Sequence, residues 1–476
     1  MVGGTKMYQL FNKDTLVALF DEETYELIKL CDDKLPIGFK SFSDWIYYRQ
    51  GSYFNTNADI ITYALYISSF DEYIRRTFAT SLNDTFWVKK DDVWADWSLV
   101  SLYKNDFDES ISKYSIAPYL VVDYMKEIQE KPKEVWFHAP ELTCEGSFPR
   151  CFRRENSDIF FYKDGGPDGD NAYSEMLASE IAVFIAPENH IPYSVEIFGD
   201  QIVSKCKLFT SDKVGYVPMY KLYNSFQEAE DYLIESFPIN LAQIYLVDAL
   251  TFNTDRHLGN YGVLVDNDTL KVIKAAPIFD LNYANLVPPN INLLSKDTQL
   301  SQTEKPRQAK SFLELGVKAL QLYPALVLKL EDFKSFHFKF RGDANISEEM
   351  VIAIEDFVHE QAEQILTAYS ENKIYEVKDN SHEASLKLQA FMESVFEYVM
   401  SVNDIQIVVS TDKDTGVYIK YIHDGREVTF DFQRHLVTVN SAFIGITLDS
   451  LKTLDEKFYN FILKLQEEFN KGDYKI

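Results

Sequence analysis

The sequence has few cysteines, no pattern of a signal peptide in its first residues and no long apolar run. Four cysteines in 476 residues, with no C-x-x-C pair, exclude a disulfide-stabilised scaffold. The first residues, MVGGTKMYQLF, lack a basic segment followed by an apolar one, so no secretion signal is predicted. No stretch approaches the roughly 18 apolar residues of a membrane-spanning helix. These absences predict a soluble, cytoplasmic protein.

Basic residues are outnumbered by acidic ones: the sequence has 47 Lys and Arg and 74 Asp and Glu, which gives a net charge of −27. So negative a chain repels nucleic-acid phosphates and anionic lipid head groups, because binding to either depends on clustered cations. We therefore expect no autonomous nucleic-acid binding and no membrane binding, whereas a basic protein partner is compatible with this charge. The 35 Phe, 30 Tyr and 5 Trp indicate folded cores rather than disorder.

The length of 476 residues suggests about three domains. We expect an N-terminal α+β region over residues 1–135, a core over 136–372 and a small C-terminal domain over 380–476. Strand patterns fill the core to about residue 222 and helical patterns follow, which is an α+β layout and not the alternation of a parallel sheet. The core elements expected are strands at 159–163, 195–198, 201–209 and 271–275, and helices at 172–185, 237–250 and 349–371.

The C-terminal domain has its own pattern of helix and strand. A helix is expected at 385–401, then four alternating runs between 404 and 440, then a charged closing helix. Asp424-Gly425 lies between two of these runs and predicts a tight hairpin, because this pair readily adopts positive φ. No chemistry is evident there, so we expect a structural or partner-binding role.

The residues that suggest chemistry lie in one loop and one segment just after it. Asp255 and Asn260 have the D-x-x-x-x-N spacing that places a base and a metal ligand on one loop, and Asp280 follows a predicted strand. Phosphoryl transfer needs a carboxylate to orient the acceptor hydroxyl, and oxygen ligands for Mg²⁺ at fixed offsets. Each element alone arises by chance in many proteins. Their order along the chain, together with an upstream lysine at a strand end, is what favours phosphoryl transfer.

This loop and the Phe279-Asp280-Leu281 segment resemble the HipA-like serine/threonine kinases, whose loop reads D-x-H-x-x-N. The loop, Asp255-Arg256-His257 to Asn260, is also similar to the D-R-H-x-x-N loop of phosphatidylinositol kinases. The resemblance covers about half of the chain. It implies a two-lobed protein-kinase-like fold, with ATP and Mg²⁺ as cofactors. We expect the N-terminal α+β region and a small C-terminal α/β domain to flank this fold.

The same resemblance assigns roles to further residues. Leu142–Arg150 looks like the phosphate-binding loop, with Thr143 as an autophosphorylation candidate; Arg150 replaces the more usual lysine and so changes the geometry of that charge. Lys163 fits the lysine that contacts the α- and β-phosphates, and Glu175 fits its partner, in competition with Glu180 on the same helix. The implied cofactor-binding residues are Gly146, Ser147, Arg150, Lys163, Glu175, Leu208, Phe209 and Thr210, the last three in a strand that leads to the adenine.

The function predicted is ATP- and Mg²⁺-dependent phosphoryl transfer to a protein Ser or Thr. Asp255 would orient the hydroxyl, Asn260 and Asp280 would bind the metal, and His257 would neighbour the phosphates or be a buried structural imidazole. The resemblance further implies a toxin or a stress or phage-defence kinase, with a basic, antitoxin-like DNA-binding partner. Two alternatives stay open: a nucleotide-binding scaffold without turnover, and a lipid kinase. The acidity and the lack of any Lys or Arg between Asp280 and Lys296 count against the lipid kinase.

Overall fold

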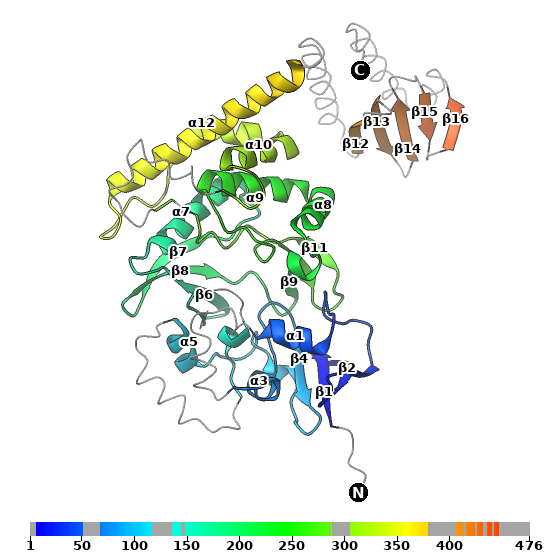
Figure 1. The fold of residues 1–476 in the computed structure, drawn as a ribbon, viewed down its shortest axis with the longest axis vertical. Coiled ribbons are helices and arrows are strands. Elements are labelled where there is room, and N and C mark those ends of the chain that lie inside the picture. Colours follow the sequence, from blue (N-terminus) through cyan, green and yellow to red (C-terminus); the bar gives the residue numbers. More distant parts are fainter. Residues whose placement is uncertain are drawn as a thin grey trace. The chain divides into compact units, whose positions relative to one another are not determined.

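The computed structural model divides into two compact units, Met1–Tyr369 and Ser370–Ile476 (Figure 1). The residues described in the first unit are 6–50, 67–116, 136–143, 148–284, 286–287 and 305–369. Those described in the second are 370–378, 406–412, 416–423, 426–431, 436–439 and 442–446. Within these ranges, no helix has both the length and the apolar character needed to cross a membrane.

The N-terminal part of the first unit is built on an antiparallel sheet with strand order β3-β2-β1-β4 (Figure 1). Its strands are β1 (Met7–Asn12), β2 (Thr15–Asp21), β3 (Leu27–Leu30) and β4 (Phe86–Lys90). Burial alternates along β1, so that Tyr8 and Leu10 enter a core that also contains Phe42 and Ile74. The last two come from helices α1 (Phe42–Arg49) and α3 (Phe70–Thr77). The short helices α4 (Trp97–Val100) and α5 (Glu109–Ile116) follow.

A second antiparallel sheet, β5-β6-β8-β7, begins the part of the chain that holds the candidate site. Its strands are β5 (Arg150–Glu155), β6 (Asp158–Asp164), β7 (Tyr193–Phe198) and β8 (Gln201–Lys207). The strands expected at 159–163 and 195–198 are confirmed by β6 and β7. The strand expected at 201–209 is two residues too long: β8 ends at Lys207, and only the backbone N–H of Leu208, which donates to the carbonyl of Ile159 in β6, continues the pairing beyond it.

A third antiparallel sheet has the strand order β11-β10-β9. Its strands are β9 (Val214–Pro218), β10 (Gly262–Asp266) and β11 (Val272–Ala275).

The same part of the chain also contains helices. Those described are α7 (Asp170–Ile185), α8 (Phe226–Ser236), α9 (Pro238–Thr251), α10 (Phe312–Leu322), α11 (Leu326–Asp332) and α12 (Glu348–Lys378). The helices expected at 172–185, 237–250 and 349–371 are confirmed by α7, α9 and α12.

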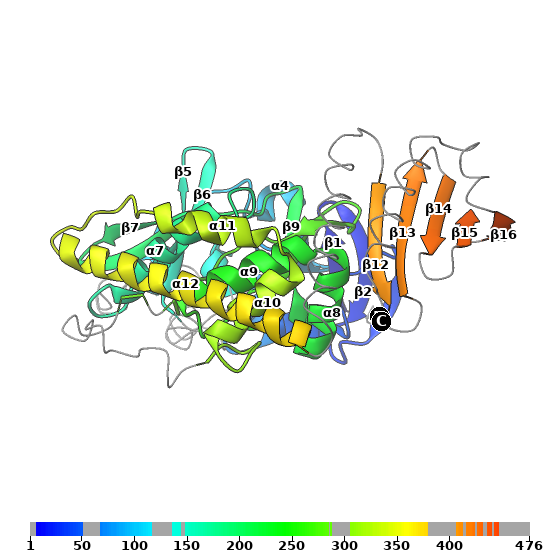
Figure 2. The same ribbon diagram turned by 90° about the horizontal axis from the view of Figure 1, so that it is seen from above.

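The main apolar core lies between these helices, with α9 at its centre (Figures 1 and 2). Helix α9 is buried over nearly its whole length. Gln361 of α12 donates to the carbonyl of Ala249 in α9 at 3.2 Å. Gly316 lets α10 approach α12 closely, because a Cβ there would lie 2.5 Å from the Cδ1 of Ile365. The candidate catalytic loop therefore follows directly from a rigid, buried helix.

Several of the helix starts have a local cause that is visible in the sequence. Helices α1, α3, α8 and α10 each begin after a serine whose hydroxyl accepts the N–H of an acidic residue three positions later. Such a serine satisfies one of the backbone donors that a helix start leaves open, and the acidic residue favours the positive end of the helix. These serines are Ser41, Ser69, Ser225 and Ser311.

The second unit contains an antiparallel sheet of consecutive strands, β12-β13-β14-β15-β16. The strands are β12 (Gln406–Asp412), β13 (Gly416–His423), β14 (Arg426–Asp431), β15 (Leu436–Val439) and β16 (Ala442–Ile446). β13 and β14 pair antiparallel up to His423 and Arg426, while Asp424-Gly425, where the tight turn was expected, lie outside the described residues. The antiparallel order fits an α+β layout and corrects the expectation of a small α/β domain, which would need parallel strands. The helices expected at 385–401 and at the end of the chain lie outside the described residues.

The fold is thus a mixture of helices and antiparallel sheets, as the α+β prediction has it. The two-lobed arrangement and the division at 135 and 372 stay predictions.

Candidate functional site

Lys163, Glu175 and Asp280 meet although they come from three separate elements. Lys163 lies near the end of β6, Glu175 in the second turn of α7 and Asp280 five residues after β11. Lys163 Nζ lies 2.9 Å from Glu175 Oε1 and 2.6 Å from Asp280 Oδ1. Both Lys163 and Glu175 are buried. The competing candidate, Glu180, instead accepts hydrogen bonds from the backbone N–H groups of 339 and 340, away from the lysine.

Further hydrogen bonds fix this cluster. Glu175 Oε2 accepts from the hydroxyl of Ser204, and Oε1 also accepts the backbone N–H of Leu281. The backbone of Asp280 has φ of 57°, a left-handed conformation that is uncommon for residues other than glycine. Such local strain persists only where the surroundings enforce it, and it is frequent at functional sites.

The three charges determine each other's ionisation. Burial acts to lower the pKa of Lys163, but the carboxylates of Asp280 and Glu175 outweigh it and raise that pKa above its usual value. Burial acts to raise the pKa of Asp280, but Lys163 outweighs it and lowers that pKa. Burial raises the pKa of the fully enclosed Glu175, with Lys163 opposing this only in part. At neutral pH the cluster therefore presents a fixed ammonium and the ionised carboxylate of Asp280.

The loop that follows α9 is held by a buried ion pair that sequence reasoning did not identify. Arg256 donates to both oxygens of Asp248, from Nε at 2.9 Å and from Nη2 at 2.8 Å, and both side chains are fully buried. The Nη1 of Arg256 donates to the carbonyls of Asn260 and Phe279, at 3.0 and 2.8 Å. The guanidinium of Arg256 thus forms hydrogen bonds both to the candidate loop and to the segment that contains Asp280. The signal was an acidic residue within an otherwise apolar, buried helix, because such a charge requires a buried partner.

The loop positions its polar residues individually. The Nδ2 of Asn260 donates to the backbone carbonyl of Asp255 at 3.0 Å, which orients the amide. His257 is not the buried imidazole considered as an alternative, because 44% of its side chain is exposed. Its Nδ1 accepts the N–H of Gly259 at 2.9 Å. The carboxylate of Asp255 is 27% exposed and pairs with Arg307, whose Nη2 lies 2.6 Å from Oδ1.

A cavity of about 230 Å³ brings most of these residues together. One part of its wall is polar and contains cations, carboxylates and amides, and another part is aromatic. The sequence-predicted residues that line it are Arg150, Lys163, Leu208, Phe209, Thr210, Asp255, His257, Asn260 and Asp280. Glu175 lies behind Lys163 and does not line the cavity. The aromatic part includes Phe152, Phe161, Phe209, Tyr216 and Phe279.

The phosphate-binding loop expected at 142–150 is described only at its two ends. Gly146 and Ser147 lie outside the described residues. Arg150 begins β5 and lines the cavity, and its Nε donates to the carbonyl of Phe148 at 3.0 Å. Thr143 does not line the cavity; its buried hydroxyl donates to the carbonyl of Pro140 at 3.1 Å. Phosphorylation of Thr143 would therefore require this turn to move.

The segment Leu208–Thr210 lines the cavity as irregular chain and not as the strand expected. The ring of Phe209 lies 5.2 Å from that of Phe279 and 5.5 Å from that of Tyr216, measured between ring centroids. The hydroxyl of Thr210 donates to the carbonyl of Leu82, far away in the sequence. The last contact, and the presence of Asn83 on the cavity wall, are features that sequence reasoning missed.

The donors present fit a nucleotide with Mg²⁺. Within the described residues, no group of three or more His, Cys, Asp or Glu could hold a metal ion on its own. Mg²⁺ does not need such a group, because it binds one or two protein oxygens and completes its shell with phosphates and water. Asp280 and Asn260 can supply these oxygens, Lys163 and Arg150 can face phosphates, and the aromatic wall can face a base.

Comparisons with known proteins give weak similarities only. No protein-family model and no curated protein sequence matches this chain. Among solved structures, the chain is similar to the Helicobacter pylori proinflammatory kinase CtkA, with 18% identity over 47% of this chain and 95% of that one, at a TM-score of 0.37. It is also similar to a chain of the Shewanella oneidensis HipA–HipB toxin–antitoxin complex with operator DNA, with 12% identity over 76% of this chain and 97% of that one, at a TM-score of 0.42. The function proposed below rests on the site and not on these similarities.

Proposed function

We propose that this protein binds ATP with Mg²⁺ in the 230 Å³ cavity and transfers the γ-phosphate to a hydroxyl of a protein substrate. The observation that carries the proposal is Lys163 between Glu175 and Asp280, on the wall of a cavity that also contains Asp255 and Asn260. A fixed cation, two oxygen donors for a metal and one carboxylate for the acceptor are the parts that phosphoryl transfer requires.

Each residue has a defined part in this reaction. Lys163 stays protonated because its pKa is raised, so it can hold phosphate oxygens at any physiological pH. Asp280 stays ionised because its pKa is lowered, and its carboxylate and the amide oxygen of Asn260 would hold Mg²⁺. When bound, Mg-ATP supplies the phosphoryl group and a metal charge that stabilises the transition state.

Asp255 would orient the acceptor hydroxyl and accept its proton. Its side chain lies on the cavity wall and is partly exposed, as access for a protein substrate requires. The aromatic wall would hold the base and exclude water from it.

A binding titration tests the nucleotide part of the proposal. Wild-type protein should bind ATP with Mg²⁺ in calorimetry, and Lys163→Met should weaken binding by about 10- to 100-fold, since it removes charge-assisted hydrogen bonds. Asp268→Asn is the control, because Asp268 is exposed, pairs with Lys13 and does not line the cavity. A wild type that binds no ATP contradicts the proposal. Binding without any transfer would instead favour the nucleotide-binding scaffold.

The finer parts of the proposal derive from the sequence resemblance. They are a Ser or Thr acceptor, a toxin or a stress or phage-defence role, and a basic, antitoxin-like DNA-binding partner. Phosphoamino-acid analysis of a labelled substrate tests the acceptor: phosphoserine or phosphothreonine agrees with it, and label in lipid extracts would favour the lipid kinase. Growth tests the toxin role: expression of wild type should slow growth and Asp255→Ala should relieve this, whereas equal growth would contradict it.

A further inference from the structure

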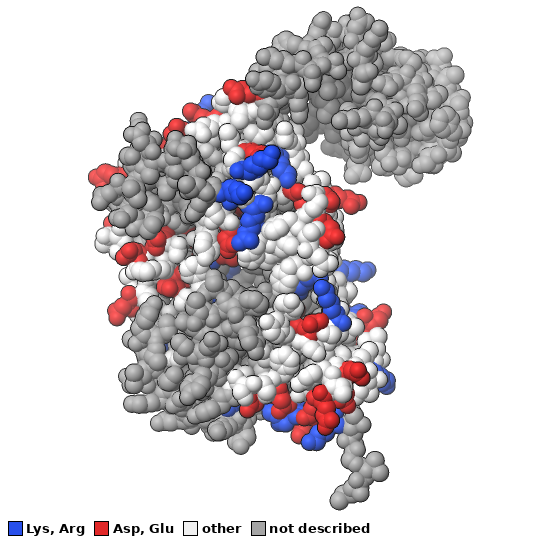
Figure 3. Space-filling model, in the orientation of Figure 1, with Lys and Arg blue, Asp and Glu red and all other residues white. Residues whose placement is uncertain are grey.

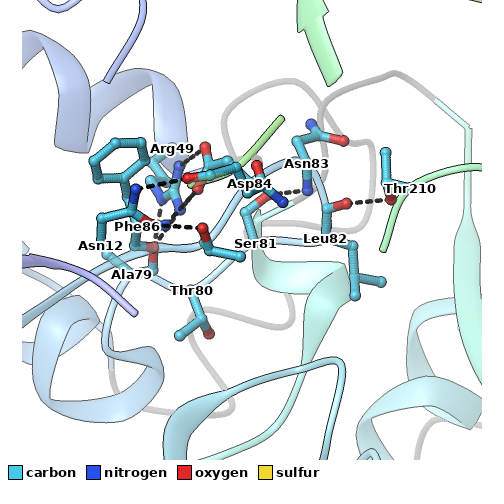
Figure 4. A network of polar contacts seen from close by, with 12 residues as sticks. Asn12, Arg49, Ala79, Thr80, Ser81, Leu82, Asn83, Asp84, Phe86 and Thr210 are labelled. Atoms are coloured by element: carbon cyan, nitrogen blue, oxygen red, sulfur yellow. Dashed lines mark hydrogen bonds and ion pairs between the residues drawn. The ribbon is translucent and has the colours of Figure 1, made fainter. Parts of the chain in front are cut away.

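Residues 79–84, in the connection between α3 and β4, belong to the network of polar contacts in Figure 4, and Asn83 among them lines the cavity. This loop is braced from behind by Arg49, which is buried and donates to both carboxylate oxygens of Asp84 at 2.7 Å. The same guanidinium donates to the carbonyls of Ala79 and Phe86 and lies 4.5 Å from the ring centroid of Trp45. Burial acts to raise the pKa of Asp84, but Arg49 outweighs it and lowers that pKa, so this brace is a persistent ion pair.

The tip of the loop is joined to the cavity wall by its backbone. The carbonyl of Leu82 accepts from the hydroxyl of Thr210 (Figure 4). The carbonyl of Asn83 accepts the N–H of Tyr216 at 2.7 Å. The N–H of Asn83 donates to the hydroxyl of Ser81 at 3.0 Å. Both backbone groups of Asn83 are therefore occupied, and neither bond involves its side chain.

Asn83 lines the cavity together with Phe209, Thr210 and Tyr216. Among the residues that the structure describes, its carboxamide has no hydrogen-bond partner. A carboxamide carries a donor and an acceptor side by side, the complement of an adenine edge with its ring nitrogen and amino group. Aromatic side chains nearby supply the faces on which a base can stack.

We propose that Asn83 binds the hydrogen-bonding edge of the nucleotide base, so that the N-terminal region is a working part of the nucleotide site. This inference rests on the function proposed above. The brace from Arg49 and the backbone bonds of Leu82 and Asn83 hold in place the loop backbone that carries the amide before the nucleotide arrives. Such preorganisation reduces the entropy that binding must otherwise overcome.

The test compares ATP with purine riboside triphosphate, which lacks the 6-amino group, on full-length protein. Wild type should bind ATP about five- to tenfold more tightly, because one neutral hydrogen bond is missing in the analogue. Asn83→Leu keeps the size of the side chain and the backbone bonds but removes the amide. It should bind both nucleotides equally, and more weakly than wild type binds the analogue, because the bond to the ring nitrogen is lost together with the bond to the amino group. Asn224→Leu is the matched control, since Asn224 is exposed and does not line the cavity, and it should discriminate like wild type.

The outcomes separate this inference from the function on which it rests. If wild type binds neither nucleotide, the proposed function fails and the inference with it. If wild type binds ATP but Asn83→Leu discriminates as strongly as wild type, only the inference fails. Weaker binding of both nucleotides by the same factor in Asn83→Leu would also overturn it, since that is what a purely structural role predicts. Thermal melting checks that each variant is folded.

Discussion

The guanidinium of Arg307 forms an ion pair with the carboxylate of Asp255, with 2.6 Å between Nη2 and Oδ1. The neighbouring Gln308 donates to the backbone carbonyl of Arg256, so the segment that leads into α10 covers one side of the candidate loop. Lys305 and Lys310 are exposed in the same segment, and Lys and Arg side chains gather over the region of α9 and α10 in Figure 3. An acceptor hydroxyl that approaches Asp255 must therefore compete with Arg307.

Arg307→Ala should increase the basal rate of ATP hydrolysis, because it leaves Asp255 open to water. Both partners are partly exposed, and such ion pairs contribute about 1 kcal/mol or less, so the increase should be at most about fivefold. Steady-state phosphate release measures it, with Lys310→Ala as the control in the same segment. A lower rate in Arg307→Ala would show that the guanidinium assists the reaction rather than blocking the base.

Lys163→Met should lower the stability of the protein by about 3–5 kcal/mol at neutral pH, because it leaves the buried carboxyl of Glu175 and the partly exposed carboxylate of Asp280 without their cation. Without Lys163 the folded-state pKa of Asp280 should rise above its unfolded value, and that of Glu175, which is already raised, should rise further. The variant should then lose stability as the pH rises, and the deficit should be smaller at pH 5 than at pH 8. Urea unfolding of both proteins at the two pH values measures this, and an equal deficit would contradict it.

Asp248→Asn should impair both stability and transfer, although Asp248 does not line the cavity. It leaves the buried guanidinium of Arg256 without its counter-charge, at a cost of about 3–5 kcal/mol. Because Arg256 joins the backbone of Asn260 to that of Phe279, the metal-binding oxygens should also lose alignment. Metal titration of the folded fraction should show a higher Mg²⁺ requirement for ATP binding. An unchanged requirement would show that Arg256 only stabilises the fold.

Glu141 gives the protein a pH dependence of its own. Burial raises the pKa of this carboxyl from 4.5 to about 7, although its Oε1 accepts from the hydroxyl of Ser112 and the N–H of Phe152. The folded state thus holds the proton more tightly than the unfolded state, so stability falls as the pH rises from about 4.5 to 7 and then levels off. Glu141→Gln keeps both hydrogen bonds and removes this loss.

The melting temperature of Glu141→Gln, relative to wild type, should therefore rise between pH 5 and pH 8, by an amount equivalent to at most about 3 kcal/mol. A difference that stays constant over this range would show that Glu141 is ionised in the folded protein at pH 5.

The elements that hold the site could be predicted where the local pattern is strong. The strand that ends near Lys163 and the helix that carries Glu175 have clear periodicity, and their pairing matches the sequence resemblance. Leu208–Thr210 was expected as strand, but β8 ends at Lys207 and the hydroxyl of Thr210 donates to the carbonyl of Leu82, which is distant in the sequence. Local propensity contains no information on such partners.

The remaining parts of the site depend on tertiary contacts. Thr210 donates to the carbonyl of Leu82 across 128 residues, and Arg307 reaches Asp255 across 52 residues. Neither contact leaves a spacing or period in a single sequence. Asp248 is different, because a lone carboxylate in a buried helix requires a cationic partner. The sequence does not indicate, however, that this partner is Arg256.

Transfer of labelled γ-phosphate in the presence of Mg²⁺ tests the central claim most directly. Wild-type protein, incubated with labelled ATP and a mixture of candidate protein substrates, should transfer label to protein. Asp280→Ala should lower this transfer at least about a hundredfold, because it removes a carboxylate from the metal site. Asp268→Asn should label as wild type does, since its side chain is exposed and outside the cavity. Equal labelling by wild type and Asp280→Ala would contradict the assignment of this cavity as the site of phosphoryl transfer.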